Sequence, residues 1–271
     1  MEGFDLRGFY EEVGEKYPEE EIIYRTLRGI LRKRFILKQI ENFHGSLLDI
    51  GCNKGVYLRE YKKGVAVGVD ISWNVLKKAR KELVNGRLIL GDAEDLGFIK
   101  DESFHNALCS EVLEHVLHPD RVMKEISRVL KPGGRALITT PNYKGQKPGW
   151  VDTGILREYG VQKQRYFHTA FTPQELEKLA EGSNLRVIQS GTLEKEVKYA
   201  AKIPALIFMI IREINRRLFR RGRLDYLNQE VFEFLTLLIY RMCRLTGLNW
   251  LLLKLIPRGV RSFVLVEKGG I

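Results

Sequence analysis

A glycine-rich turn near the start of the chain carries the residue types best suited to chemistry. An apolar run from Leu47 to Ile50 includes Asp49, and Gly51 and Gly55 follow it before helical character begins. Glycine lets the backbone approach a ligand closely, and the N-terminus of the next helix offers unpaired N–H groups. A strand, a glycine turn and a helix in this order are typical of a cradle for a nucleotide-like cofactor.

Acidic side chains follow each of the first four apolar runs that read as strands. They are Asp49, Asp70, Asp92 with Glu94, and Glu111. In a doubly wound fold the ligand lies at the carboxyl ends of the strands, where a carboxylate can accept hydrogen bonds from ribose hydroxyls or an adenine amine. Acidic residues are also common in turns and caps, so the indication comes from finding all four strand ends acidic.

Strand-like and helix-like segments alternate through the middle of the chain. The predicted strands are 46–50, 65–70, 87–90, 106–110, 135–140, 185–190 and 262–267. Predicted helices occupy 74–83, 119–129 and 173–182, the last with a capping box between Thr172 and Glu175. One long amphipathic helix is expected over 19–43, and a sharp turn over 130–134. The alternation predicts an α/β fold with a doubly wound, mostly parallel sheet and helices on both faces.

Most of the positive charge lies in one block near the end of the chain. The net charge is +11, and residues 195–261 hold 14 Lys and Arg against 5 Asp and Glu. The same block contains apolar runs at 205–211, 231–245 and 250–256. Such a charge indicates an anionic partner: nucleic acid, lipid headgroups or an acidic substrate. The sequence has no run of about 18 uninterrupted apolar residues, so a membrane-spanning helix is not expected.

The cysteines and the first residues indicate the cellular compartment. Cys52, Cys109 and Cys243 are far apart and show no CxxC spacing, so the sequence predicts neither a disulfide framework nor a zinc site. The first residues lack the basic start and apolar stretch of a signal peptide. We therefore expect a cytoplasmic protein.

These motifs together resemble the class I S-adenosylmethionine-dependent methyltransferases, and most closely their ubiquinone-biosynthesis-like small-molecule branch. The resemblance rests on Leu48-Asp49-Ile50-Gly51-Cys52 with Gly55, Gly68-Val69-Asp70-Ile71-Ser72, Gly91-Asp92-Ala93-Glu94-Asp95-Leu96, Ser110-Glu111-Val112-Leu113-Glu114-His115-Val116 and Arg128-Val129-Leu130-Lys131-Pro132-Gly133-Gly134. It implies a methyltransferase with a seven-stranded Rossmann-like sheet, an antiparallel last strand and S-adenosylmethionine as cofactor. An NAD site is disfavoured because the turn is not GxGxxG.

The resemblance also implies which residues bind the cofactor. They are Asp49, Gly51, Cys52, Asn53, Gly55, Asp70, Ile71, Asp92, Ala93, Glu94 and Ser110. Asp70 would hold the ribose, Asp92 with Ala93 would meet the adenine, and Ser110 would lie near the reacting sulfur. Asn53 stands where family members usually have glycine, and Asn tolerates a left-handed backbone better than other side chains do.

A second cluster of candidate residues follows the fourth and fifth strands. Glu111, Glu114 and His115 share one face if their segment is helical, and His168 follows the fifth strand. Two carboxylates and two imidazoles would suit Mg²⁺ or Mn²⁺ as a metal site. Alternatively, His115 or His168 accepts a proton from the methyl acceptor. In a third interpretation His115 only orders the pocket wall, and the three roles remain open.

Three interpretations compete for the basic, apolar block. It is a helical cap over the substrate pocket, a contact with an anionic membrane surface, or a nucleic-acid-binding element. The apolar runs argue against nucleic acid, because phosphate contacts do not require them. We expect a small-molecule or lipid-like acceptor that is hydrophobic or amphiphilic, such as a lipid, a quinone or a polyprenyl compound. The alternatives are an RNA or other nucleic-acid methyltransferase and a non-catalytic cofactor-binding scaffold that docks to a membrane or partner.

The expected organisation follows from these interpretations. A helical segment at 1–44 precedes a cofactor-binding core at 45–194, the basic helical insertion spans 195–261, and the final strand of the core sheet lies in 262–271. If the insertion contacts lipid, the protein lies at the inner face of the membrane.

Overall fold

The computed structural model of the chain forms two compact units. The residues that it describes are 5–83, 87–142, 149–152, 154–162, 165–219 and 222–270. Unit 1 comprises Met1–Glu20, Phe35–Gly191 and Arg261–Ile271, and unit 2 comprises Glu21–Arg34 and Thr192–Val260. Each unit is built from segments that are distant in the sequence.

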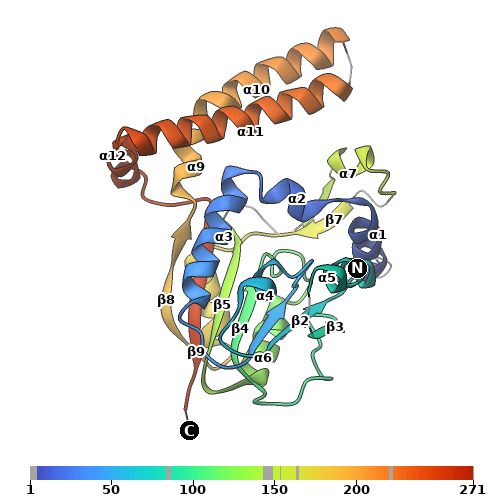
Figure 1. The fold of residues 1–271 in the computed structure, drawn as a ribbon, viewed down its shortest axis with the longest axis vertical. Helices are drawn as coiled ribbons and strands as arrows, with labels where there is room; N and C mark the ends of the chain where they lie inside the picture. Colours follow the sequence, from blue (N-terminus) through green and yellow to red (C-terminus); the bar gives the residue numbers. More distant parts are fainter. Residues whose placement is uncertain are drawn as a thin grey trace. The chain divides into compact units, whose positions relative to one another are not determined.

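Unit 1 is organised around a seven-stranded sheet with the strand order β3-β2-β1-β4-β5-β9-β8 (Figure 1). The strands are β1 (Leu47–Ile50), β2 (Ala66–Asp70), β3 (Arg87–Leu90), β4 (Phe104–Ser110), β5 (Leu130–Pro141), β8 (Leu185–Leu193) and β9 (Arg261–Lys268). The pairs from β3 to β5 are parallel, whereas β9 runs antiparallel to β5. The predicted doubly wound, mostly parallel Rossmann-like fold is therefore confirmed, including the antiparallel last strand.

Helices cover this sheet where the sequence pattern predicts them. They are α4 (Val56–Glu60), α5 (Trp73–Glu82), α6 (Pro119–Val129) and α8 (Pro173–Glu181). The predicted capping box of α8 is present, because Thr172 and Glu175 each accept a hydrogen bond from the other's backbone N–H. Ser72 caps α5 by accepting from Val75 N–H.

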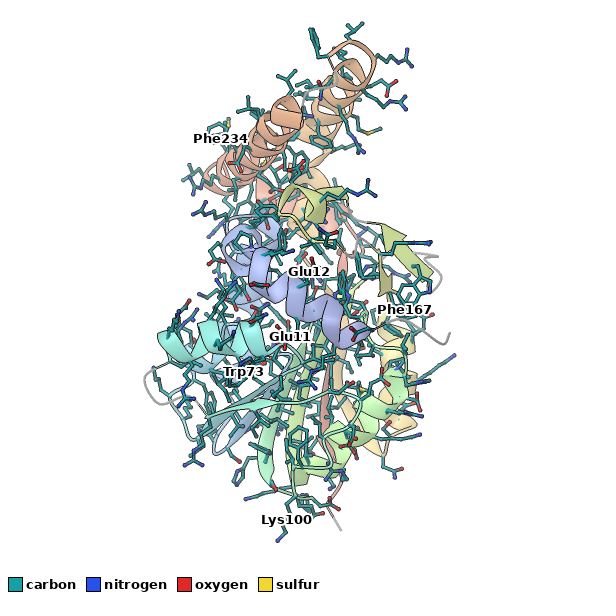
Figure 2. The ribbon with its side chains drawn as sticks, turned by 90° about the vertical axis from the view of Figure 1, so that its right-hand side faces the viewer. Glu11, Glu12, Trp73, Lys100, Phe167 and Phe234 are labelled. Carbon is teal, nitrogen blue, oxygen red and sulfur yellow. The ribbon has the colours of Figure 1, made fainter. Side chains whose placement is uncertain are left out.

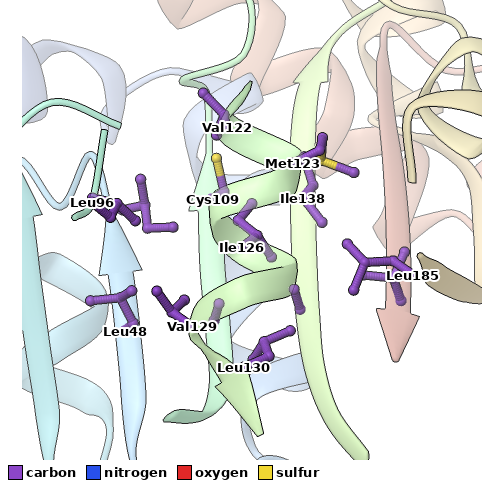
Figure 3. Packing of buried hydrophobic residues seen from close by; sticks show 14 of the residues in the cluster. Leu48, Leu96, Cys109, Val122, Met123, Ile126, Val129, Leu130, Ile138 and Leu185 are labelled. Atoms are coloured by element: carbon purple, nitrogen blue, oxygen red, sulfur yellow. The ribbon is translucent and has the colours of Figure 1, made fainter. Parts of the chain in front are cut away.

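The core of unit 1 lies between α6 and the central strands. Val122, Met123, Ile126 and Val129 recur at helical spacing on α6 and are fully buried. Figure 3 shows them packed against side chains of the sheet such as Ile138. This packing fixes the carboxyl end of β4, where several candidate residues begin.

The first helices differ from the single helix predicted over 19–43. The structure has α1 (Leu6–Lys16), α2 (Glu19–Ile23) and α3 (Leu27–Ile40). Thr26 separates α2 from α3, because its hydroxyl donates to the Ile23 carbonyl and accepts from Gly29 N–H. A local hydroxyl bond of this kind competes with a continuous helix.

Two further predictions about elements are corrected. The sharp turn predicted at 130–134 is instead the irregular start of β5, where the pairing register with β4 shifts between Phe104 and Asn106. A two-stranded hairpin of β6 (Gly149–Asp152) and β7 (Arg165–His168), with α7 (Gly154–Glu158) between them, was not predicted. These strands are only four residues long and lack a clear alternating pattern.

Unit 2 is helical. It contains α9 (Lys195–Ala200), α10 (Lys202–Ile214), the π-helical turn η1 (Asn215–Phe219), α11 (Gly222–Leu245) and α12 (Leu248–Leu255), together with the first part of α3. Its small core joins Leu27, Val197, Ala200 and Tyr240. None of the helices in the described part of the chain combines the length and hydropathy that a membrane span requires.

Candidate functional site

The glycine turn between β1 and α4 has a left-handed backbone at three positions. Gly51, Asn53 and Gly55 have φ values of 70°, 48° and 77°. Asn53 thus adopts the conformation that its residue type allows at lower cost than most others. The backbone at Gly51 also runs close to the next loop, because a Cβ built there would lie 2.3 Å from Cγ2 of Val112. A residue larger than glycine at this point would require the Val112 side chain to move.

We expect Gly51→Ala to destabilise the protein more than Gly133→Ala does. Both positions have a positive φ, but nothing lies within 4 Å of a Cβ at Gly133. Gly133→Ala should therefore lower the free energy of unfolding only by the left-handed strain of about 1–2 kcal/mol, whereas Gly51→Ala adds the clash with Val112. Denaturant midpoints measure both changes. Equal losses of stability would show that the approach of Val112 does not require glycine.

Two aspartates from β1 and β2 lie beside this turn. The carboxylate of Asp70 accepts hydrogen bonds from Asn53 N–H (2.9 Å) and Ser72 N–H (3.0 Å), so it ties the turn to the start of α5. Asp49 is only 1% exposed, and its Oδ2 has no hydrogen-bond partner among the described residues. A buried oxygen without a partner is costly unless a ligand satisfies it.

Three glutamates of the N-terminal segment reach the same region, and sequence reasoning missed them. Glu11 on α1 accepts hydrogen bonds from Trp73 N–H, Asn74 N–H and the Ser72 hydroxyl at the start of α5. Figure 2 labels Glu11 and Trp73 on these two helices. Glu19 accepts from the side-chain amide of Asn53 (2.9 Å) and Glu20 from Lys54 N–H (3.0 Å). The acidic character of residues 1–20 was the only signal in the sequence.

Three carboxyl groups of this region, those of Glu20, Asp70 and Asp49, hold protons more tightly than free carboxyl groups do. Burial raises the pKa of Glu20 to about 7. Burial also raises the pKa of Asp70 to about 6, and the nearby Glu19 and Glu11 add to the effect. The pKa of Asp49 is likewise raised by burial and then by Glu20 and Asp70. Like charges in a buried space disfavour ionisation, so the cluster is suited to a ligand that carries positive charge.

The candidate residues after β3 and β4 form hydrogen bonds within the protein that hold their loops in place. Asp92 accepts from Glu94 N–H in a local turn, with Ala93 partly buried between them. Glu94 accepts from Leu117 N–H and His118 N–H, so its carboxylate holds the loop after β4 in place. The Ser110 hydroxyl lies 3.0 Å from that of Thr139. Cys52 is buried against Leu58 and Leu76, and Ile71 is partly buried at the end of β2.

The helical segment on which a shared face of Glu111, Glu114 and His115 depended is not present. This segment is a turn, because Glu111 has a φ of 61° and the chain leaves β4 without helical hydrogen bonds. Glu111 forms an ion pair with Arg261 of β9 and accepts from the Thr139 hydroxyl. Glu114 is buried and accepts from the Thr140 hydroxyl.

Only part of the predicted set of metal ligands lies together. In the described ranges no group of three or more His, Cys, Asp or Glu is placed to hold a metal ion. Glu111 is engaged by Arg261, whereas Glu114 lies 3.9 Å from Nε2 of His115, and the rings of His115 and His168 lie 5.4 Å apart. The arrangement therefore gives the predicted Mg²⁺ or Mn²⁺ site no support.

The two histidines meet in an aromatic cluster. The ring of His115 lies 5.4 Å from that of His168, 5.5 Å from Tyr166 and 6.0 Å from Tyr10, measured between centroids. Burial and the neighbouring His168 lower the pKa of His115 to about 3. Burial also lowers the pKa of His168. Both imidazoles are therefore neutral near pH 7.

Tyr10 brings the N-terminal helix into this cluster. Its hydroxyl is buried and has no hydrogen-bond partner among the described residues. Burial raises its pKa well above the usual value, and Glu19 and Glu114 add to the effect. Tyr10 and Tyr166 were not among the residues singled out from the sequence, because their proximity to His115 depends on the fold of α1 and β7.

Comparisons with known proteins identify the family of the chain. A family model described as a methyltransferase domain matches residues 48–138. An uncharacterised protein of Methanocaldococcus jannaschii is 30% identical over 202 residues, which cover 72% of this chain and 88% of that protein. A ubiquinone biosynthesis O-methyltransferase of Coxiella burnetii is 27% identical over 167 residues, covering 58% of this chain and 70% of the relative.

Solved structures share the fold. A chain from the complex between the Haloferax volcanii Trm112 methyltransferase activator and a methyltransferase gives a TM-score of 0.61 at 17% identity, covering 98% of this chain and 99% of that one. Phosphoethanolamine N-methyltransferase 2 of Haemonchus contortus, solved with S-adenosyl-L-methionine, gives 0.58 at 18% identity and covers 99% and 61%.

The sheet order and the glycine turn define a Rossmann-like α/β fold. The chain belongs to the S-adenosylmethionine-dependent methyltransferases. The residues of the site fit this cofactor in their charge, because the buried carboxylates of Asp49 and Asp70 suit a ligand with a cationic sulfonium.

Proposed function

We propose that the protein transfers a methyl group to a small hydrophobic or amphiphilic acceptor, with His115 or His168 accepting the acceptor's proton. Bound S-adenosylmethionine supplies an electrophilic methyl group on a sulfonium. The observation that carries this proposal is the pairing of His115 with His168, whose rings lie 5.4 Å apart beside Tyr166. Methyl transfer then needs alignment of the acceptor and removal of its proton.

The side chains have separate tasks in this proposal. Asp70 would hold the ribose hydroxyls and the glycine turn the methionine part, while Asp92, Ala93, Glu94 and Ile71 would surround the adenine. The loop that carries Ser110 would line the space near the sulfur. Tyr10 and Tyr166 would exclude water and orient an aromatic or apolar acceptor beside His115, since their rings lie within 6.0 Å of its ring.

The acceptor class is supported from two directions. The cluster around His115 is aromatic, and a matched relative is a ubiquinone biosynthesis O-methyltransferase, which makes a phenol-like hydroxyl a reasonable acceptor group. Exposed apolar side chains in unit 2 favour an acceptor that is itself amphiphilic and is presented at the inner face of a membrane. We propose a cytoplasmic protein that is peripheral to that membrane.

Transfer of a labelled methyl group tests this proposal. The protein is incubated with methyl-labelled S-adenosylmethionine and, in parallel, with a prenylated phenol, a phospholipid mixture or RNA. We expect label in the prenylated phenol or the lipid fraction. Label in RNA would instead identify a nucleic-acid methyltransferase, and cofactor binding without transfer to any of the three would indicate a scaffold.

The affinity for S-adenosylmethionine should rise with pH. In the free protein the pKa of Asp70 is raised to about 6 and that of Glu20 to about 7, so these groups are partly protonated below neutrality. A cationic ligand favours their ionised forms, so binding releases protons, and affinity increases from about pH 5 to about pH 8. Calorimetry in two buffers of different ionisation enthalpy measures this release.

Glu20→Gln provides the matched control for this dependence. The amide oxygen can still accept from Lys54 N–H, whereas the titration is removed. We expect fewer protons to be released by the variant. An affinity that is constant between about pH 5 and about pH 8 would rule out the carboxylate cluster as the cofactor's charge partner.

A further inference from the structure

Unit 2 exposes apolar side chains on three successive helices. On α11 they form one continuous stripe at spacings of three and four residues: Leu227, Val231, Phe234, Leu238, Met242 and Leu245. Phe234 is 63% exposed and Leu245 is 88% exposed. The opposite side of α11 carries the buried residues Asn228, Thr236 and Tyr240. The stripe is therefore the face of α11 that does not contribute to the core of unit 2.

The neighbouring helices extend this apolar surface. On α10 the exposed side chains include Ile203, Leu206, Ile210 and Ile214, which also recur at helical spacing. The inner side of α10 packs on α11 through Phe208 and Phe232, whose rings lie 5.6 Å apart, and the Phe208 carbonyl accepts from the Asn228 amide. Figure 1 shows the two helices as a hairpin, and Figure 2 labels Phe234 on it.

Helix α12 adds a third exposed face. Leu248, Leu251 and Leu255 recur at three- and four-residue spacing and are all exposed. Trp250 is 66% exposed, and the Lys254 ammonium lies 3.5 Å from the centroid of its ring. An exposed tryptophan beside a lysine is typical of residues that lie at a membrane–water interface.

Charge indicates what covers this surface. Residues 195–261 carry 14 Lys and Arg against 5 Asp and Glu, and Arg212, Arg241 and Lys254 are exposed on the same helices as the apolar residues. The pairing of Glu213 with Arg216 and Arg217 and the presence of Glu230 on α11 offset only part of this charge. The surface thus combines a broad apolar area with an excess of positive charge.

We propose that α10, α11 and α12 dock the protein on the surface of an anionic lipid bilayer. Amphipathic helices with basic flanks insert their apolar side chains at the boundary between headgroups and acyl chains, and each nearby Lys or Arg adds attraction to anionic lipid. A second copy of the chain is a less suitable occupant, because it would place the same positive charge against this surface. A dimer contact would also require only one apolar stripe, whereas three helices expose apolar side chains. Docking itself requires neither cofactor nor methyl acceptor. The inference rests on the proposed function only in one respect, namely that the methyl acceptor comes from the membrane.

Vesicle flotation of the 271-residue chain tests this inference. One set of vesicles contains phosphatidylcholine alone, and the other contains phosphatidylcholine with phosphatidylglycerol. We expect partitioning to the anionic vesicles to be roughly tenfold stronger and to weaken as salt is raised. The triple variant Phe234→Ser, Leu238→Ser and Met242→Ser should lose most of this binding, because all three side chains belong to the exposed stripe of α11.

A matched control places the same change on unit 1. Val65→Ser, Phe98→Ser and Ile188→Ser also replace three exposed apolar side chains, and this variant should float as the wild type does. A double variant, Arg212→Gln and Arg241→Gln, should retain the fold and lose the preference for anionic vesicles. Circular dichroism and calorimetric binding of S-adenosylmethionine check that each variant is folded.

Three results would overturn the proposal. The first is equal flotation of the wild type and the stripe variant. The second is a wild-type protein that does not bind vesicles but forms a concentration-dependent dimer, with the stripe variant remaining monomeric. This result would identify a second copy of the chain as the occupant. The third is a clear loss of unfolding stability in the stripe variant without a change in flotation, which would identify an intramolecular cap. Vesicle binding without methyl transfer would leave the docking surface intact and refute the proposed function alone.

Discussion

His115→Gln is expected to lower kcat by roughly 100-fold or more while the affinity for S-adenosylmethionine stays within a few-fold of wild type. The imidazole of His115 lies among Tyr10, Tyr166 and His168 and is neutral near pH 7 because its pKa is lowered to about 3. Glutamine preserves much of the volume and polarity but cannot accept a proton at this pH. Single-turnover methyl transfer measures the loss, and calorimetry measures the cofactor affinity separately.

The pH dependence and a control variant distinguish proton acceptance from a structural role. In wild type, the activity should not fall through protonation of His115 until the pH approaches its pKa of about 3. In the unfolded chain His115 takes up a proton below about pH 6.5, so its neutral burial costs stability as the pH falls from there, and His115→Gln should be relatively more acid-stable. His44→Gln replaces an exposed histidine and should change neither kcat nor the stability at acidic pH. An unchanged kcat in His115→Gln would show that His115 is not the proton acceptor and would leave His168 as the candidate.

Asp70→Asn is expected to weaken S-adenosylmethionine binding by roughly 100-fold. Its carboxylate accepts from Asn53 N–H and Ser72 N–H, so it fixes the glycine turn and presents negative charge at the end of β2. Asparagine keeps the size but loses the charge and turns an N–H donor toward one of these partners. Calorimetry gives the affinity, and thermal unfolding reports any accompanying loss of stability.

Asp101→Asn is the control for this change. Asp101 is exposed, pairs with Arg128 and precedes β4, at the end of the strands opposite to Asp70. We expect wild-type affinity for this variant. Affinity that is unchanged by both Asp70→Asn and Asp70→Ala would exclude Asp70 from the cofactor site, even if the enzyme class is correct.

The local parts of the fold were predictable because their causes are local. Apolar runs that end in glycine or an acidic residue predicted the strands of the sheet to within a few residues. The capping box of Thr172 and Glu175 predicted the start of α8. The left-handed conformation of Asn53 followed from its residue type. In contrast, the break at Thr26 depends on one hydroxyl that competes with the helix, which a periodic pattern does not reveal.

The parts of the site that were missed depend on contacts between distant segments. Glu11, Glu19 and Glu20 reach the turn and α5 only after the N-terminal segment folds onto the sheet. The ion pair of Glu111 with Arg261 joins β4 to the last strand, and it removes a carboxylate that sequence spacing had assigned to a metal. No local pattern encodes such pairings, because they arise from the order of strands in the sheet.

Calorimetric titration of the wild-type protein with S-adenosylmethionine measures directly whether the glycine turn and the acidic strand ends bind this cofactor. We expect saturable binding at one site per chain, accompanied by release of protons below neutral pH from the cluster around Asp70 and Glu20. Absence of binding by the folded protein between about pH 5 and about pH 8 would contradict the assignment of the glycine turn and the acidic strand ends to this cofactor.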